Sequence, residues 1–252
     1  MNIKILLGLP VLASKHGQDV DNLMVFIHWL MIALFVGWLI YFACALFRFR
    51  QSRNPRASYT GVRSHTSTYI EGAVAVVECV LLIGFALPFW ATAADKFPKE
   101  SEATVIRVAA QQFNWNVLYP GPDGAFGRQD INFVSAQNHF GLDPGDPQTK
   151  DDIYTSNEIH VPVNKPVIVH ISSKDVIHSF KVIPLRIMQD AIPGMSIPIH
   201  FVPTKTGVYQ INCAQLCGNG HAAMAAGRLH VDTPEDFEKW IKSKSGGTTS
   251  YE

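Results

Sequence analysis

The sequence predicts a two-helix transmembrane hairpin followed by an all-β domain of the sandwich or barrel type. Two long apolar runs, residues 24–47 and 70–92, lie in the first third of the chain. From about residue 103, short alternating segments separated by Pro, Gly, Asn and Asp indicate many short strands. No stripe of Lys and Arg with interleaved aromatic residues occurs, so we expect no nucleic-acid partner.

Each apolar run is long enough to cross a hydrocarbon core of about 30 Å as a helix. Five arginines lie between the runs, and no acidic residue precedes Glu71 there, so the positive-inside rule places this loop in the cytoplasm and both termini outside. Residues 1–23 then form an extracytoplasmic segment, whose signal-like run IKILLGLPVLA we expect to remain uncleaved. The arginines are Arg48, Arg50, Arg53, Arg56 and Arg63.

The β-domain is expected over residues 93–241, with a Gly-, Pro- and Asp-rich insertion at residues 120–157. Near its end, Thr233 is a suitable N-cap and Pro234 a suitable first helical residue. Apolar residues at helical spacing follow, so a helix is expected to pack on the domain before a tail at residues 242–252.

Residues 213–224 gather four side chains that bind soft metals. Thiolate, thioether and imidazole together are typical of copper ligation, whereas a structural zinc site would need a fourth Cys or His. A disulfide is an alternative, but it leaves the imidazole and the thioether unexplained. A second thiolate indicates two metals that share bridging sulfur, and His178, after an apolar strand, is the best candidate for a further ligand. The four are Cys213, Cys217, His221 and Met224, whereas His160, His170, His200 and His230 are expected to face solvent.

The pattern C-x-x-x-C-x-x-x-H-x-x-M, with D-V-x-H-S and D-A-I-P-G upstream, resembles cytochrome c oxidase subunit II over nearly the whole chain. The resemblance implies a cupredoxin-like Greek-key barrel and a mixed-valence dinuclear copper centre. It also implies bridging ligands Cys213 and Cys217, terminal ligands His178 and His221, a weak ligand Met224 and the backbone carbonyl of Gln215.

The chain departs from this family in the metal loop, in an aromatic stretch before it, and at Glu78, where an apolar or proline residue is usual. Gln215 stands where many members have Glu, which leaves the family's Mg²⁺ site open. Phe113 stands where a tryptophan is usual in the stretch over which cytochrome c docks, and Trp115 is retained. Electrons could enter through Phe113 or Trp115, or both could simply cover the metal loop.

Two further features concern charge. Glu71 aligns with the family's acidic residue at the entrance of a proton path, although it could instead be an interfacial carboxylate. An acidic surface on the insertion and its flank could steer a basic donor or could simply be solvated. Its residues are Asp123, Asp130, Asp143, Asp146, Asp151, Asp152 and Glu158.

The resulting interpretation is a subunit of a bacterial inner-membrane oxidase. Its partners would be subunit I with its haem, other oxidase subunits, membrane lipid and an external cytochrome c or cytochrome c-containing complex. No C-x-x-C-H motif is present, so the donor haem belongs to another protein. The alternatives are a structural subunit II of a quinol oxidase and a membrane-anchored copper-delivery protein.

Overall fold

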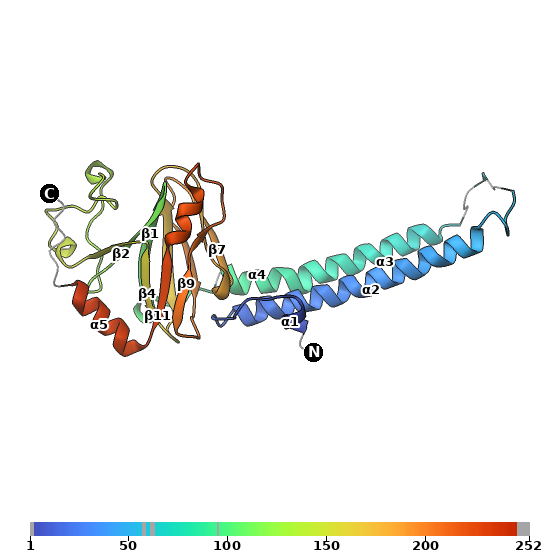
Figure 1. Ribbon diagram of the computed structural model, residues 1–252, viewed down its shortest axis with the longest axis horizontal. Helices are drawn as coiled ribbons and strands as arrows, with labels where there is room; N and C mark the ends of the chain where they lie inside the picture. The colour runs from blue at the N-terminus through green and yellow to red at the C-terminus, as the bar shows by residue number, and fades with distance from the viewer. Residues whose placement is uncertain (1–2, 57–58, 61–63, 95, 246–252) are drawn as a thin grey trace. The chain divides into compact units, whose positions relative to one another are not determined.

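The computed structural model describes residues 3–56, 59–60, 64–94 and 96–245 (Figure 1). The chain divides into two compact units, one of Met1–Gly8 with Asp19–Lys96 and one of Leu9–Gln18 with Phe97–Glu252. The first unit is helical and the second carries all the described strands. Arg63 of the predicted cytoplasmic loop lies outside the described residues.

The helical unit contains two helices that are long and apolar enough to cross a membrane, Gly17–Phe49 and Thr66–Ala91. Helix α2 (Gly17–Phe49) begins ahead of the predicted run, because the polar turn before residue 24 is also helical. The second span consists of α3 (Thr66–Leu81), a π-helical turn η1 (Leu82–Ala86) and α4 (Leu87–Ala94), and a short α1 (Ile3–Leu6) lies near the N-terminus. Pro88 has no N–H to donate to the carbonyl four residues earlier, which accounts for the irregular turn just before it.

The β-unit consists of three small sheets with the strand orders β3-β2-β1-β5-β8, β10-β6-β7 and β4-β11-β9. Most neighbours are antiparallel, but β1 pairs with β5 and β4 with β11 in parallel, so strands that are distant in sequence lie side by side in these sheets. The strands are β1 (Thr104–Gln111), β2 (Asn114–Tyr119), β3 (Ile153–Ser156), β4 (Glu158–Pro162), β5 (Val167–Ser173), β6 (His178–Val182), β7 (Ile187–Ala191), β8 (Ile197–Phe201), β9 (Gly207–Gln210), β10 (Asn212–Cys213) and β11 (Arg228–Asp232).

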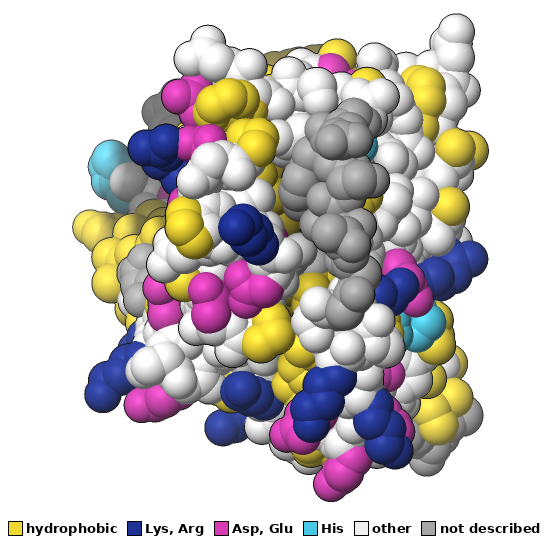
Figure 2. Space-filling model, turned by 90° about the vertical axis from the view of Figure 1, so that its left-hand side faces the viewer, with side chains coloured by type: hydrophobic (Ala, Val, Ile, Leu, Met, Phe, Trp, Pro, Cys, Tyr) yellow, Lys and Arg dark blue, Asp and Glu magenta, His cyan; other side chains and the backbone are white. Residues whose placement is uncertain are grey.

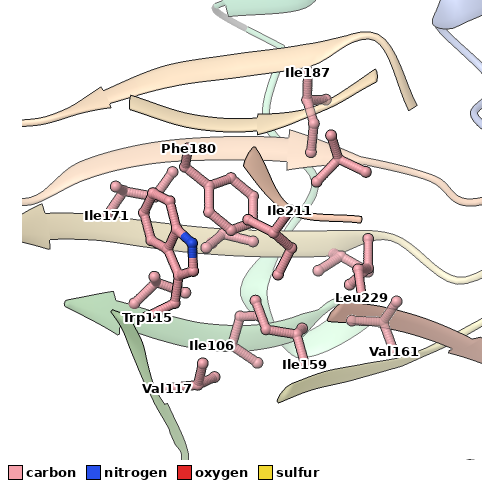
Figure 3. Close-up of a cluster of buried hydrophobic side chains, with 14 of the residues drawn as sticks. Ile106, Trp115, Val117, Ile159, Val161, Ile171, Phe180, Ile187, Ile211 and Leu229 are labelled. Carbon is pink, nitrogen blue, oxygen red and sulfur yellow. The ribbon is translucent and has the colours of Figure 1, made fainter. Parts of the chain in front are cut away.

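One apolar core holds these sheets together, and Figure 3 shows part of it. Alternate residues of β1 and β5 point into the core. Ile106 of β1 and Val169 of β5 are buried there, whereas the next residues along each strand face the other side of the sheet. The indole of Trp115 packs edge-on against the ring of Phe180, with 5.3 Å between the ring centroids. The core therefore extends to the strand that carries His178.

The segment Leu9–Gln18 is part of this domain although it precedes the first long helix. Ala13 is completely buried in the core cluster, and its backbone N–H donates to the carbonyl of Pro184. The hydroxyl of Ser14 donates to the carbonyl of Leu185 over 2.6 Å. Half of the signal-like run is thus built into the β-domain, and a fragment starting near residue 95 would lack these contacts.

The insertion is ordered by its own acidic side chains. Each carboxylate of the predicted acidic surface accepts a hydrogen bond, mostly from a nearby backbone N–H, and Asp143 also pairs with Arg128. These residues are Asp123, Asp130, Asp143, Asp146, Asp151, Asp152 and Glu158. Figure 2 shows a face on which basic and acidic side chains are interspersed, without a large patch of one sign. These carboxylates therefore have a structural use, and this face offers no single-sign surface for steering a donor.

The predicted C-terminal helix is present as α5 (Pro234–Lys244), and the Thr233 hydroxyl accepts a hydrogen bond from the N–H of Asp236. Trp240 of α5 stacks on His160 with 4.3 Å between ring centroids, and His160 stacks in turn on His230. The expectation that His160 faces solvent is therefore wrong: the ring is buried beneath α5, and its two nitrogens contact Asp232 and Glu158.

The buried carboxylate of Asp152 makes the stability of the domain depend on pH. Burial raises the pKa of Asp152 to about 7, while a hydrogen bond from the Gly127 N–H opposes this rise. The unfolded pKa is about 3.9, so the folded chain binds more protons between these values and the free energy of unfolding falls as pH rises. Relative to wild type, Asp152→Asn should gain about 1–4 kcal/mol of unfolding free energy between about pH 4 and pH 8.

Chemical unfolding of the full chain in detergent at several pH values measures this difference. The matched control is Asp130→Asn, because Asp130 is an exposed carboxylate of the same insertion and does not shift the pKa of Asp152. A difference between Asp152→Asn and wild type that does not change with pH would contradict the assignment.

Candidate metal centre

The two cysteines of the loop face each other without a bond between them. Cys213 is the last residue of β10, and Cys217 lies four residues further on at a buried position. Their sulfur atoms are 3.9 Å apart, almost twice the length of a disulfide bond of about 2.05 Å. Both thiols are free in the structure. A thiolate binds a metal from about 2.3 Å, so one ion or more can lie between these sulfur atoms.

An imidazole lies on each side of the sulfur pair. The Nδ1 atom of His178 is 3.9 Å from the sulfur of Cys213, and the Nδ1 atom of His221 is 3.4 Å from the sulfur of Cys217. The ligand atoms of His178, Cys213 and Cys217 all lie within 4.8 Å of one another. The structure therefore brings together the two cysteines and the histidines that the sequence selected from distant segments.

The orientation of His178 is fixed by a residue that the sequence analysis did not select. Asp175 Oδ1 lies 2.9 Å from Nε2 of His178, which leaves Nδ1 directed at the sulfur atoms. Asp175 is held by the backbone N–H groups of Gln112 and Val176. A carboxylate that holds the second nitrogen of a ligand histidine is a usual feature of metal sites, so Asp175 in the D-V-x-H segment could have been found.

Two more predicted ligands lie on the same loop. The backbone carbonyl of Gln215 is 3.0 Å from the sulfur of Cys213, so it faces the cluster, whereas the Gln215 side chain is exposed. Met224 is fully buried in the core cluster, to which Cys217 also belongs, and its own carbonyl accepts a hydrogen bond of 3.0 Å from the Trp115 indole N–H. The core thus holds the far end of the loop in place.

The electrostatics of the loop favour a bound cation. Burial, together with the neighbouring Cys213, raises the pKa of the Cys217 thiol to about 11. Without a metal, Cys217 is therefore a thiol at neutral pH. A soft cation between the two sulfur atoms would stabilise both thiolates and release their protons, so this donor set fits copper-type ligation.

A second group of possible ligands, Glu158, His160 and His230, also lies within 4.8 Å. It fits a metal less well, because both nitrogens of His160 already contact carboxylates. Its ring is also nearly parallel to that of His230, with 6° between the planes, so their lone pairs cannot converge on one ion. We treat this group as the support of helix α5.

Phe113 and Trp115 occupy different positions around the loop. Phe113 is half-buried and lies against Gly218 and Gly220, where an added Cβ would meet its ring. Trp115 is fully buried and stacks edge-on against His178, with 6.3 Å between ring centroids. Trp115 therefore contacts the inner side of the centre and does not reach the surface, whereas Phe113 is partly exposed.

Glu71 lies in the other unit, in the second turn of α3, where the Ser67 hydroxyl donates to its Oε1 over 2.6 Å. It has no part in the metal cluster. Glu78 of the same helix is exposed as well.

An apolar helical hairpin and a β-domain that presents two thiols and two imidazoles define a membrane-anchored metal-binding protein. Residues 104–228 match the family model for the periplasmic domain of cytochrome c oxidase subunit II. The chain is 29% identical to the alternative cytochrome c oxidase subunit 2 of Bradyrhizobium diazoefficiens, over 92% of this chain and 82% of the relative. It is 33% identical to the probable cytochrome c oxidase subunit 2 of Rickettsia bellii, over 85% and 74%.

Among solved structures, the periplasmic domain of subunit II of the Bradyrhizobium japonicum cytochrome oxidase is 28% identical and has a TM-score of 0.44, over 60% of this chain and 98% of that chain. The match to the family model and the similarity to these relatives show that this chain belongs to the cytochrome c oxidase subunit II family. It is a subunit of an oxidoreductase complex and a membrane protein with its β-domain outside the cytoplasm. The predicted fold class, a two-helix hairpin with a cupredoxin-like Greek-key barrel, is confirmed.

The contact between Phe113 and Gly220 gives a testable prediction for the loop. The φ angle of Gly220 is −94°, which alanine can adopt, so only the ring of Phe113 excludes a side chain here. We expect Gly220→Ala to lower the free energy of unfolding by about 1–3 kcal/mol through overpacking. Phe113→Ala should make room and relieve most of this cost.

A double-mutant cycle of Phe113→Ala and Gly220→Ala, measured by chemical unfolding, checks this contact. The expected interaction energy is about 1 kcal/mol or more, because the two residues touch. Simple additivity of the two changes would show that the ring does not lie against the loop.

Proposed function

We propose that this chain is the copper-bearing subunit II of a respiratory cytochrome c oxidase. Its dinuclear copper centre would accept electrons singly from an external cytochrome c and pass them to haem in subunit I, for oxygen reduction coupled to proton translocation. The observation that carries the proposal is the pair of free cysteines, with sulfur atoms 3.9 Å apart and an imidazole on each side.

In this proposal the loop and one neighbouring strand supply all the ligands. Cys213 and Cys217 would be the thiolates shared by both ions, His178 and His221 would be terminal ligands, Met224 a weak ligand, and the carbonyl of Gln215 would complete the set. When bound, the copper pair supplies one-electron storage with little change of geometry. The role of this chain is to hold the ligands in fixed positions and to exclude most of the water around them.

Burial favours this proposal over the two alternatives. A copper-delivery protein needs ligands that a partner can reach, whereas His178 and Met224 are completely buried. A structural subunit of a quinol oxidase needs no metal, so it would have no reason to keep two unbonded cysteines between two histidines. Without a carboxylate at Gln215, the proposal includes no Mg²⁺ site.

The surroundings of the centre support a route for electrons from outside. Phe113 is the half-exposed aromatic residue over the loop, and the apolar side chains of Ile177 and Leu216 are exposed beside the ligands. Exposed apolar groups at a redox centre suit contact with another protein. Electrons from the donor would therefore enter at Phe113, while Trp115 supports the ligands from beneath.

The remaining parts of the proposal concern the membrane. We place the chain in a bacterial inner membrane, with subunit I, other oxidase subunits and lipid around the hairpin. The exposed carboxylates of the second span suit contact with another subunit, because an ionisable group facing lipid is costly. Glu71 would lie at the entrance of a proton path.

The test is copper analysis with electron paramagnetic resonance on the full chain, purified in detergent and loaded with copper. Wild type should bind two ions per chain and show the seven-line pattern of an electron shared over two copper nuclei. Cys217→Ser should lose this pattern, because one bridging thiolate is replaced by a hard, weakly acidic hydroxyl.

The matched control is Cys44→Ser, which removes an exposed thiol of helix α2 and should leave the copper content and the spectrum unchanged. A wild-type chain with no copper, or with one copper and a single-ion spectrum, would overturn the proposal and favour the structural or delivery function.

A further inference from the structure

A cavity of about 710 Å³ lies on the β-domain, outside the metal centre. Its floor is the face of β1 and β5 that points away from the core. The insertion covers it through Phe126, Gln129 and Phe140, and the loop after β7 closes one side with Pro193. Its volume is in the range of about 300–1,000 Å³ that is usual for sites of small molecules.

The alternation of the strands puts charged groups on this floor. Ile106 and Val108 of β1 point into the core, so Arg107 between them points into the cavity. Arg107 lies opposite His170 in the parallel pairing of β1 with β5. A charged strand residue that faces solvent needs no charge partner, because water solvates it. Arg107 instead lies beneath the insertion.

Arg107 is held in position while its charge has no close partner. Its guanidinium lies 4.0 Å from the centroid of the Phe126 ring, and Nη1 donates to Gln129 Oε1 over 2.8 Å. Within the described part of the chain, no carboxylate pairs with it at salt-bridge distance. Burial lowers the pKa of Arg107, and the charges of Asp152 and Glu100 oppose this only in part.

A second cation lies toward the other end of the cavity. The ammonium group of Lys174 donates to the Ser135 carbonyl over 3.2 Å and contacts Nδ1 of His139 over 2.9 Å. Burial lowers the pKa of Lys174, and burial with the Lys174 charge lowers that of His139. Among the described residues that line the cavity, Glu100 alone carries a carboxylate, and its side chain is 74% exposed and 3.9 Å from His170.

The rest of the lining is largely apolar. Phe126 and Phe140 of the insertion and Val105 of the floor line it, as does Ile131, which is largely exposed. Apolar walls with a few fixed polar groups are typical of sites that bind the body of a ligand and orient its charged end. A planar guanidinium suits a carboxylate, because it can donate two parallel hydrogen bonds.

We propose that this cavity binds a small organic anion, a carboxylate with an apolar or aromatic body. The carboxylate pairs with Arg107, the body lies against Phe126 and Phe140, and Lys174 adds to the positive field. The site is independent of the copper ligands, although Lys174 directly precedes Asp175, the residue that orients His178.

The test is calorimetric titration of the full chain in nanodiscs with 2-naphthoate, with empty nanodiscs as the blank. The neutral isostere 2-naphthamide and inorganic phosphate serve as matched probes for the body and for the charge. We expect saturable binding of naphthoate, and binding weaker by about ten-fold or more for naphthamide and for phosphate.

Two variants locate the site, so the test does not depend on the folding of one of them. Arg107→Gln should weaken naphthoate binding by about ten-fold or more, and Lys174→Gln by a smaller factor. The control Lys165→Gln removes an exposed charge away from the cavity and should leave the affinity unchanged.

Several results would overturn the proposal. These are absence of saturable naphthoate binding, equal binding of naphthamide or phosphate, and an affinity that neither cavity variant changes. A reduction of the same size in Lys165→Gln would likewise point to general charge attraction. The copper content of each variant, measured in parallel, keeps this result separate from the function proposed for the metal centre.

Discussion

Two thiols side by side in a buried loop are the constraint on which the rest of the site depends. With the sulfur atoms 3.9 Å apart, burial and the neighbouring Cys213 raise the pKa of the Cys217 thiol, and a cation between the sulfur atoms would offset this rise. The surrounding structure keeps this separation. Trp115 anchors the end of the loop through the Met224 carbonyl, and Gln112 donates from its side chain to the Cys217 carbonyl over 2.6 Å.

The same groups connect the metal loop to the core, so packing and ligation support each other. Trp115 contacts both Phe180 in the core and the ring of His178. A change in the core near β6 would therefore move a ligand, and loss of the ligands would loosen the core. Rigid packing of this kind keeps ligand geometry constant when the charge of a bound metal changes.

Much of the architecture could be predicted from the sequence, because hydrophobic period and turn residues report local structure. The hairpin, the short strands and the Thr233 cap follow from such patterns. Contacts between distant segments could not be predicted in this way. His160 is buried because Trp240 of α5, which lies 80 residues later in the chain, stacks on its ring. The alternation of apolar and polar residues in its strand instead predicted an outward-facing side chain.

The Leu9–Gln18 segment has a consequence for biogenesis. Ser14 donates a hydrogen bond to Leu185 across 171 positions of sequence, so the segment before the hairpin must wait for residues that are synthesised after the whole hairpin. The Leu9–Gln18 segment and the rest of the β-domain must also reach the same side of the membrane before they can make this contact. The domain can therefore be completed only after both spans have been inserted with the correct orientation. Metal loading would then be a late step of assembly.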